Sequence, residues 1–204
     1  MARFVITGTG TEIGKTVFAA GLCALTGGDY WKPVQTGTED GTSDSKTVLH
    51  LSGARVHPPI YQFPQPLSPH RAAELAGETL DPAKLVPPTD VPLVAEGAGG
   101  VLVPITRDLL SADLFARWGM PVVLVCTTGL GTISHSLTAI EALRGRGCAL
   151  HGLAFVGADN PDNIATIAAF SGARVLGRLP RLPRLDRASL LAAMTEHFDV
   201  EDFA

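Results

Sequence analysis

The stretch Phe4-Val5-Ile6-Thr7-Gly8-Thr9-Gly10-Thr11-Glu12-Ile13-Gly14-Lys15-Thr16 is the most informative part of the 204-residue sequence. An apolar, β-branched run leads into a glycine-rich turn, and a helical pattern begins at Gly14. In such a turn the backbone N–H groups and the helix dipole converge on phosphate oxygens. Lys15 would reach the outer phosphates of a nucleoside triphosphate, and the Thr16 hydroxyl would ligate Mg²⁺. The stretch therefore predicts a strand, a phosphate-binding loop (P-loop) and a helix.

The loop departs by one residue from the usual pattern G-x-x-x-x-G-K-[ST]. Thr9 stands where the pattern has its first glycine, and Gly8 lies one position too early. An ordinary Gly/Thr-rich turn is the alternative interpretation. We favour the phosphate-binding loop, because packing alone does not account for Gly14-Lys15-Thr16 at a helix start and the flanking elements fit the motif.

Short, Val-rich apolar runs alternate with helical patterns along the chain. Continuous apolar strands are typical of parallel sheets that are covered on both faces. We therefore expect one P-loop NTPase-like α/β domain over residues 1–204, with a mostly parallel sheet of about seven strands flanked by helices on both faces. The expected strands are 3–7, 30–32, 92–96, 121–127, 150–156 and 174–179. The expected helices are 15–25, 111–118 (with Ser111 as a candidate N-cap), 134–144, 162–170 and 187–198.

Residues 52–92 interrupt this alternation. They contain nine of the fifteen prolines and only short helical patterns, such as residues 70–76. We expect this segment to be a Pro-rich excursion that covers the same domain.

Composition and charge argue against several classes of protein. The formal net charge is −4 and no long basic run occurs, so neither nucleic acid nor an anionic membrane surface is expected as a partner. The three cysteines, Cys23, Cys126 and Cys148, are odd in number and lack C-x-x-C spacing, which argues against a disulfide framework or a zinc site. With no signal-peptide pattern at the N-terminus and no long apolar run, a reducing cytoplasm is the expected location.

Ligands of open parallel sheets bind beyond the carboxyl ends of the strands, where this sequence places several polar residues. Glu96 ends an apolar run, and burial of its charge would destabilise the fold by roughly several kcal/mol unless a cation compensates it. Glu96 is therefore a candidate Mg²⁺ ligand, and a surface carboxylate paired with Lys or Arg is the alternative. Lys32 could neutralise charge during phosphoryl transfer, or it could be a surface residue. Asp44 alone is best interpreted as the N-cap of the helix that follows it.

A second loop, which follows the expected strand 121–127, also begins a helix. The free N–H groups of residues 131–134 could bind a carboxylate. An N-cap formed by a Thr or Ser side chain is an equally good interpretation of the sequence.

Taken together, these motifs resemble those of dethiobiotin synthetase, an ATP-dependent ligase family of the P-loop superfamily. The loop Gly8 to Thr16 is similar to the family's G-T-x-T-E-[VI]-G-K-T, including the extra residue. The other matching stretches are Lys32-Pro33-Val34-Gln35-Thr36-Gly37, Ser43-Asp44, Leu67-Ser68-Pro69-His70, Val94-Ala95-Glu96-Gly97-Ala98-Gly99-Gly100 and Leu130-Gly131-Thr132-Ile133-Ser134-His135. The last of these has Ser134 where the family has Asn.

The resemblance implies that 7,8-diaminopelargonic acid, CO₂ and ATP are converted to dethiobiotin, ADP and phosphate in biotin biosynthesis. Carbamate formation, phosphorylation of the carbamate and closure of the ureido ring would be the successive steps. It further implies Mg²⁺ as the cofactor, ATP as a co-substrate and a homodimer with active sites near its interface.

The resemblance also implies roles for individual residues. The implied catalytic residues are Lys15, Lys32 and Thr11. The implied metal ligands are Thr16, Asp44 and Glu96. The implied nucleotide contacts are Thr11, Glu12, Ile13, Gly14, Lys15, Thr16, Val17, Asp44, Glu96 and Gly99, together with Gly157, Asn160, Pro180, Arg181 and Leu182 on the base side. The implied substrate contacts are Thr11, Lys32, Thr36 and Gly97, with Gly131, Thr132, Ile133 and Ser134 for the substrate carboxylate.

The base side departs from the family pattern, which often has an Asn after the fifth strand. Either Asn160 or a backbone group near Gly157 could take that place, so the nucleotide preference stays open. Three other functions remain as alternatives: another P-loop amidoligase, a partition-type P-loop ATPase and a kinase of a small alcohol. The amidoligase would need a glutaminase domain, for which 204 residues leave no room. The ATPase would carry an additional lysine early in the loop, where this chain has Gly8, Thr9 and Gly10.

Overall fold

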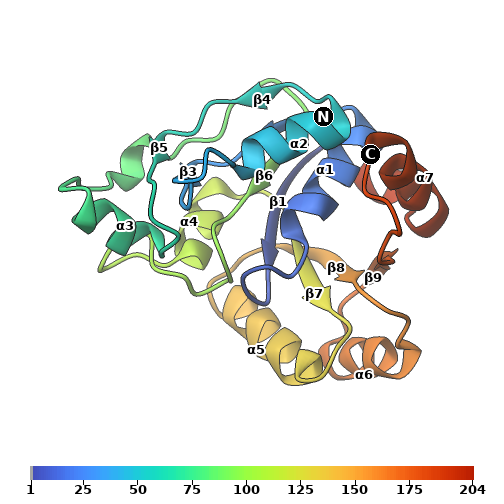
Figure 1. Cartoon of the computed structure of the whole chain (residues 1–204). Coiled ribbons are helices and arrows are strands. Elements are labelled where there is room, and N and C mark those ends of the chain that lie inside the picture. Colours follow the sequence, from blue (N-terminus) through green and yellow to red (C-terminus); the bar gives the residue numbers. More distant parts are fainter. Residues whose placement is uncertain (1) are drawn as a thin grey trace.

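The computed structural model describes residues 2–204 and is built around one parallel sheet of seven strands (Figure 1). The spatial order of the strands is β4-β2-β6-β1-β7-β8-β9, and every neighbouring pair is parallel. Their bounds are β1 Arg3–Gly8, β2 Asp29–Trp31, β4 Val56–His57, β6 Leu93–Glu96, β7 Val122–Thr127, β8 Leu150–Val156 and β9 Val175–Leu179. The predicted α/β class and the parallel sheet are confirmed.

Helices cover both faces of the sheet, as the apolar strands require. The α-helices are α1 Lys15–Thr26, α2 Asp44–Ser52, α3 Pro69–Leu75, α4 Ser111–Trp118, α5 Thr132–Gly145, α6 Pro161–Ser171 and α7 Arg187–His197. Helices α1, α2 and α7 share one apolar core with the sheet, and α4, α5 and α6 share the other (Figure 1). Short 3₁₀ helices are formed by Pro82–Lys84 and Val200–Phe203.

The first strand shows how the sequence divides between the two cores. Phe4 and Ile6 face the core under α1, and Val5 faces the opposite core, in agreement with the period of two in a strand. Val5 pairs with Ala95 on one side and with Val122 on the other, which places β1 at the centre of the sheet. Full burial of such side chains contributes about 1.5–3 kcal/mol each to the free energy of unfolding. The loop that follows β1 is therefore held on a central strand that is buried from Phe4 to Gly8.

The predicted Pro-rich excursion contains more regular structure than expected. It supplies β4, which is the edge strand of the central sheet beside β2. It also supplies β5 (Tyr61–Gln62), which pairs in parallel with β3 (Val34–Gln35) in a second, two-stranded sheet. Helix α3 lies beside this small sheet and shares a third apolar cluster with it. The prediction missed all three strands because each has only two residues, too few to show a period of two.

Two predicted helix caps are wrong. Leu110, and not Ser111, precedes α4, and the Ser111 hydroxyl donates instead to the carbonyl of Val103 at 2.9 Å. Ser43, and not Asp44, caps α2, because its hydroxyl accepts the N–H of Lys46 at 3.2 Å. The side chain of Asp44 is therefore free to point elsewhere.

All three cysteines are buried free thiols. Cys23 and Cys126 lie in the cores on opposite faces of the sheet, and burial raises the pKa of Cys126 to about 12. Cys148 also packs in a core, where its Sγ lies 3.3 Å from the carbonyl oxygen of Ala112. Within residues 2–204, no helix combines the length and the apolar character that a membrane crossing requires.

Candidate functional site

A cleft of about 560 Å³ opens beside the predicted phosphate-binding loop. It lies where β1, β2 and β6 end, which are neighbours in the sheet. The residues that line it are Thr11, Glu12, Ile13, Gly14, Lys15, Thr16, Val17, Lys32, Gln35, Thr36, Gly37, Thr42, Ser43, Asp44, Thr47, Pro66, Leu67, Ser68, Pro69, Glu96, Ala98, Gly99 and Val103. The predicted P-loop residues Thr11 to Val17, together with Lys32, Thr36, Asp44, Glu96 and Gly99, are thus brought together at one cleft.

The loop owes its path to left-handed backbone conformations and a close approach to β8. Gly14, immediately before α1, has φ 96°, and a Cβ atom there would lie 2.8 Å from Val156 Cγ1. Only glycine fits this position without strain. Glu12 also has a positive φ of 56°, which is uncommon outside glycine. The Lys15 side chain folds back over the loop, and its ammonium donates to the carbonyl of Gly10 at 2.6 Å.

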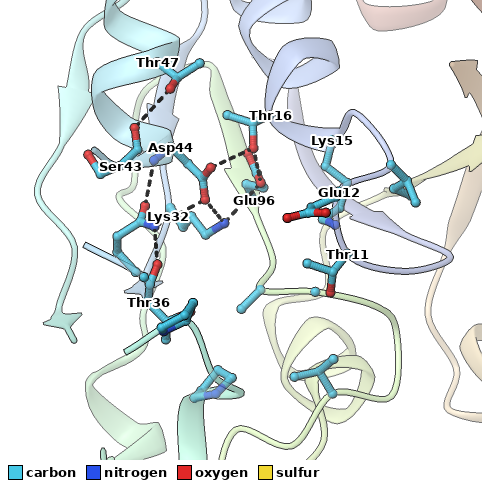
Figure 2. A pocket seen from close by; sticks show the side chains of 18 of the residues that line it. Thr11, Glu12, Lys15, Thr16, Lys32, Thr36, Ser43, Asp44, Thr47 and Glu96 are labelled. Atoms are coloured by element: carbon cyan, nitrogen blue, oxygen red, sulfur yellow. Dashed lines mark hydrogen bonds and ion pairs between the residues drawn. The ribbon is translucent and has the colours of Figure 1, made fainter. Parts of the chain in front are cut away.

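Two carboxylates and a hydroxyl meet at the base of the cleft (Figure 2). The Thr16 Oγ1 atom lies 3.0 Å from Asp44 Oδ1 and 2.9 Å from Glu96 Oε1. These residues come from α1, α2 and the end of β6, so residues 80 positions apart in the chain are in contact. The two predictions that Glu96 lies at a strand end and that Asp44 joins Thr16 are consistent with this arrangement.

Lys32 inserts its ammonium between the two carboxylates. It forms an ion pair with Asp44 and lies 3.2 Å from Glu96 Oε1. Lys32 is only 6% exposed and Glu96 only 1%, so these charges are largely removed from solvent. The surface interpretations of Lys32 and of Glu96 are therefore wrong, although the predicted pairing of Glu96 with a lysine is found in the interior.

Burial and charge act in opposite directions on these groups. Burial lowers the pKa of Lys15, and the negative charge of Glu96 offsets only part of this effect. Burial alone would also lower the pKa of Lys32, but the charges of Glu96 and Asp44 outweigh it, so the pKa of Lys32 is raised. Burial would raise the pKa of Asp44, but the Lys32 ammonium holds it below its usual range. Lys32 and Asp44 are therefore ionised together at neutral pH.

Two residues that were not predicted as site residues form hydrogen bonds with Glu96 and Asp44. The hydroxyl of Tyr30, a fully buried residue of β2, donates to Glu96 Oε2 at 2.8 Å. The side-chain amide of Gln35 accepts the N–H of Asp44 at 3.1 Å and donates to Asp44 Oδ2 at 3.4 Å. Gln35 stands within the quoted stretch that begins at Lys32, whereas only the fold places Tyr30 next to a residue 66 positions away.

The base of the cleft has the chemistry of a Mg²⁺ site. Carboxylate and hydroxyl oxygens are the ligands that this hard cation prefers, and Thr16, Asp44 and Glu96 already bring three of them together. Mg²⁺ usually takes few protein ligands and fills its other positions with water and phosphate oxygens. Within residues 2–204, no group of three or more His, Cys, Asp or Glu side chains forms an all-protein metal cage. The predicted ligands therefore fit a metal that arrives with a nucleotide.

The predicted carboxylate-binding residues Gly131, Thr132, Ile133 and Ser134 lie outside this cleft. They line a second hollow of about 560 Å³ at the start of α5, together with the fully exposed Leu130. Gly131 (φ 86°) occupies the N-cap position without a side-chain bond, and the Thr132 hydroxyl donates to the carbonyl of Thr127 at 2.5 Å. The alternative of a Thr or Ser cap is therefore wrong. The N–H of Thr132 donates to the carbonyl of Gly129 at 3.2 Å, so the N–H groups of Ile133 and Ser134 are the ones left for a ligand.

The predicted base-side residues Gly157, Asn160, Pro180, Arg181 and Leu182 do not line the cleft either. Asn160 caps α6 by accepting the N–H of Asn163 at 3.2 Å, and its amide donates to the carbonyl of Thr128 at 3.0 Å. The Gly157 carbonyl accepts a bond from Arg178 at 3.0 Å. Gly97 is likewise absent from the lining, and a Cβ atom there would lie 2.6 Å from the Phe115 ring.

Comparisons with known proteins agree on a family. Residues 2–189 match a family model described as an AAA domain. An ATP-dependent dethiobiotin synthetase from Novosphingobium aromaticivorans is 54% identical over 207 residues, covering 100% of both chains. The synthetase from Sphingopyxis alaskensis is 51% identical, also over 100% of both chains. That from Agrobacterium fabrum is 50% identical over 98% of this chain and 96% of its own.

Solved structures with a similar fold are distant in sequence. A ParA family ATPase from Chlorobium tepidum has a TM-score of 0.53 and 11% identity over 96% of this chain and 91% of its own. The MinC:MinD cell division protein complex of Aquifex aeolicus gives a TM-score of 0.54 and 11% identity, over 95% of this chain and 86% of the matched chain. At such low identity, these similarities concern the fold alone.

Proposed function

The chain belongs to the ATP-dependent dethiobiotin synthetase family, and we propose that it closes the ureido ring of dethiobiotin from 7,8-diaminopelargonic acid, CO₂ and ATP. It is an ATP-dependent ligase of biotin biosynthesis. The observation that supports the detailed reaction best is the cleft, in which a phosphate-binding loop, two lysines and two carboxylates lie together. The fold neighbours offer no comparable support for a partition-type ATPase, since they share only the architecture.

The proposed reaction has three steps. An amine of the substrate attacks CO₂ and loses a proton, which gives a carbamate. An oxygen of the carbamate attacks the γ-phosphorus of ATP, and the bond between that phosphorus and the bridging oxygen of ADP breaks. The second amine then attacks the carbamoyl carbon and loses a proton, and phosphate leaves as the ring closes. Such a sequence depends mainly on positioning and on the neutralisation of negative charge.

The lysines would provide that neutralisation. Lys15 has to exchange its bond to the Gly10 carbonyl for phosphate oxygens, and the partial burial that lowers its pKa also strengthens its electrostatic effect. Lys32 remains ionised because its pKa is raised, so it can stabilise the anionic carbamate. Thr11 and Thr36 line the same cleft and would orient the carbamate or the amines.

Thr16, Asp44 and Glu96 would hold Mg²⁺ that is bound with the nucleotide. When bound, the metal would neutralise charge on the phosphate oxygens. The Thr16 hydroxyl already joins Asp44 Oδ1 and Glu96 Oε1 through hydrogen bonds, which keeps the three oxygens close together.

A second copy of the chain would complete the substrate site. The free N–H groups at the start of α5 could bind the substrate carboxylate, but they line a hollow separate from the cleft. The lining of the hollow includes the apolar side chains of Ile133, Leu137 and the fully exposed Leu130, as expected of a surface that a partner covers. We place this homodimer in the cytoplasm, where ATP is supplied.

The proposed reaction can be tested directly. Purified protein is incubated with diaminopelargonate, bicarbonate, Mg²⁺ and ATP, and mass spectrometry then detects dethiobiotin. The Lys15→Ala variant serves as a folded control, and its turnover should fall by about 10³-fold or more. If folded wild-type protein forms no dethiobiotin, the proposal is wrong. Near-normal turnover in Lys15→Ala would contradict the role of the phosphate loop.

A further inference from the structure

The two carboxylate oxygens of Glu96 have different hydrogen-bond partners, and Tyr30 is the partner of one of them. Its hydroxyl donates to Oε2 at 2.8 Å, whereas Thr16 and Lys32 contact only Oε1, at 2.9 and 3.2 Å. Within residues 2–204, Tyr30 is the only hydrogen-bond partner of Oε2. One oxygen of Glu96 therefore faces the cleft, and the other is bonded to the interior.

The position of Tyr30 suits this task because the residue cannot move readily. It lies in the middle of β2, where it pairs with Val94 of β6 and Val56 of β4, and it is completely buried. Its ring packs in the core under α1, so the hydroxyl is fixed by both backbone and side-chain packing. Glu96 ends the adjacent strand and is itself 1% exposed, so water does not offer an alternative donor to Oε2.

We propose that Tyr30 is a positioning residue that presents Glu96 to the metal through a single oxygen. The inference rests on the proposed Mg²⁺ site of Thr16, Asp44 and Glu96. Groups that hydrogen-bond to a metal ligand fix its orientation, and their removal typically weakens metal affinity about 10- to 100-fold. Without the phenol, Oε2 would lack a partner and the carboxylate would turn toward Lys32. The Tyr30→Phe variant keeps the ring and removes only this hydroxyl.

The chain provides a matched control, because its only other tyrosine is Tyr61. The Tyr61 hydroxyl accepts the N–H of Asp81 at 3.0 Å and makes no contact with the carboxylates. Mn²⁺ binding to the complex with a non-hydrolysable ATP analogue is measured by electron paramagnetic resonance, and thermal unfolding is followed in parallel. We expect the Mn²⁺ dissociation constant to rise about 10- to 100-fold in Tyr30→Phe and to change less than about twofold in Tyr61→Phe. Affinity for the analogue in the presence of EDTA should be unchanged in both.

A double-mutant cycle separates this role from a general loss of packing. If Tyr30 acts through Glu96, the effect of Tyr30→Phe on Mn²⁺ affinity should disappear when Glu96 is already replaced by Gln. An effect of equal size in both backgrounds would overturn the inference. So would an unchanged Mn²⁺ affinity in Tyr30→Phe, provided that Glu96→Gln weakens binding. If Glu96→Gln and Asp44→Asn both leave the Mn²⁺ affinity of the wild type unchanged, the proposed metal site itself is wrong.

A second measurement retains the hydroxyl and does not depend on the stability of Tyr30→Phe. In the Tyr61→Phe background Tyr30 is the only tyrosine, so growth with 3-fluorotyrosine labels this position alone. Addition of Mg²⁺ to the complex with the ATP analogue should shift the single ¹⁹F resonance, because the acceptor of the phenol hydrogen bond then shares its charge with a cation. The same addition to the Glu96→Gln protein should cause a much smaller shift. If Mg²⁺ does not shift the ¹⁹F resonance in the Tyr61→Phe protein, the proposed link between Tyr30 and the metal through Glu96 is wrong.

Discussion

The cleft beside the phosphate loop and the hollow at the start of α5 both lie beyond the carboxyl ends of strands. They differ in the chemical groups that they offer to a ligand. In the cleft, most of the binding groups are side chains: Lys32 and Glu96 are buried, and they are hydrogen-bonded to each other and to residues of several elements. The hollow instead offers the backbone N–H groups at the start of α5 together with the hydroxyls of Ser134 and Thr138, while the Thr132 hydroxyl is already bonded to the Thr127 carbonyl.

The difference indicates which functions one chain can complete alone. The cleft already contains compensating charges, so in the proposed reaction it would need only a nucleotide and a metal in addition to the substrate. The lining of the hollow includes Leu130, which is fully exposed. We infer that phosphate chemistry is organised within one chain, whereas recognition of the substrate carboxylate depends on a second copy. The predictions below test this division, beginning with the largest expected effect.

Replacement of Lys32 should disrupt the cleft more than any change in the hollow. In the wild type, Asp44 and Glu96 share the ammonium of Lys32. Lys32→Met removes this ammonium and leaves buried negative charge without a partner, which destabilises the folded state. We expect turnover to fall about 10²-fold or more. The free energy of unfolding at pH 7 should fall by about 3 kcal/mol, a value at the lower end for a broken buried ion pair, because Asp44 is partly exposed to solvent. Urea unfolding measures the second quantity, and Lys84→Met, in an exposed 3₁₀ helix, is the control. A loss no larger than in Lys84→Met would show that the ion pairs contribute little.

The stability difference between wild type and Lys32→Met should also depend on pH. The pKa of Asp44 is below its ordinary value of 3.8, so the stabilisation from its ionised form is complete above that value and is lost as the pH falls through the folded-state pKa. The pKa of Lys32 is above its ordinary value of 10.5, so its contribution persists up to that value and is lost only at higher pH. The difference should therefore be constant near neutral pH and become smaller at both extremes. A difference that grows on acidification to pH 4 would contradict the assigned charges.

The sequence predicted the parts of this architecture that local patterns determine. Apolar runs located six strands of the central sheet, and the P-loop was located although it carries an extra residue. Lys32 and Glu96 could be singled out because each directly follows or ends an apolar run, and in a parallel sheet such positions share one edge.

What the sequence could not predict depends on contacts between distant residues. Ser43 and Asp44 are both good cap residues, and local sequence cannot tell which one caps α2. The contacts of Asp44 with Thr16 and Lys32 decide the matter, and they exist only once α1, α2 and β2 are packed together. The same holds for the Tyr30 hydroxyl, because a tyrosine in an apolar run resembles any other core residue until its partner Glu96 is known.

A change at Gly131 should affect the hollow and leave the cleft intact. Gly131 has φ 86°, and an added Cβ would lie 3.2 Å from His135 Cε1, so alanine would strain the start of α5 by about 1 kcal/mol. We expect the KM for diaminopelargonate to rise about 3- to 10-fold in Gly131→Ala while the KM for ATP stays within about twofold. Gly145→Ala at the other end of α5 is the control, because a Cβ there meets no atom within 4 Å. Equal changes in both KM values would show that the two sites are not independent.

The smallest expected effect concerns Asn160, whose side chain caps α6 and bonds to the backbone of Thr128. Its Oδ1 accepts the N–H of Asn163 and its Nδ2 donates to Thr128, so a nucleotide base would have to compete with a helix cap. Asn160→Ala should therefore lower the free energy of unfolding by about 1 kcal/mol and leave the affinity ratio between ATP and GTP unchanged. Asp186→Ala removes the equivalent cap of α7 and should cost a similar amount. If Asn160→Ala changes the affinity ratio between ATP and GTP and Asp186→Ala does not, Asn160 contacts the base, and side-chain recognition extends beyond the cleft to the carboxyl end of β8.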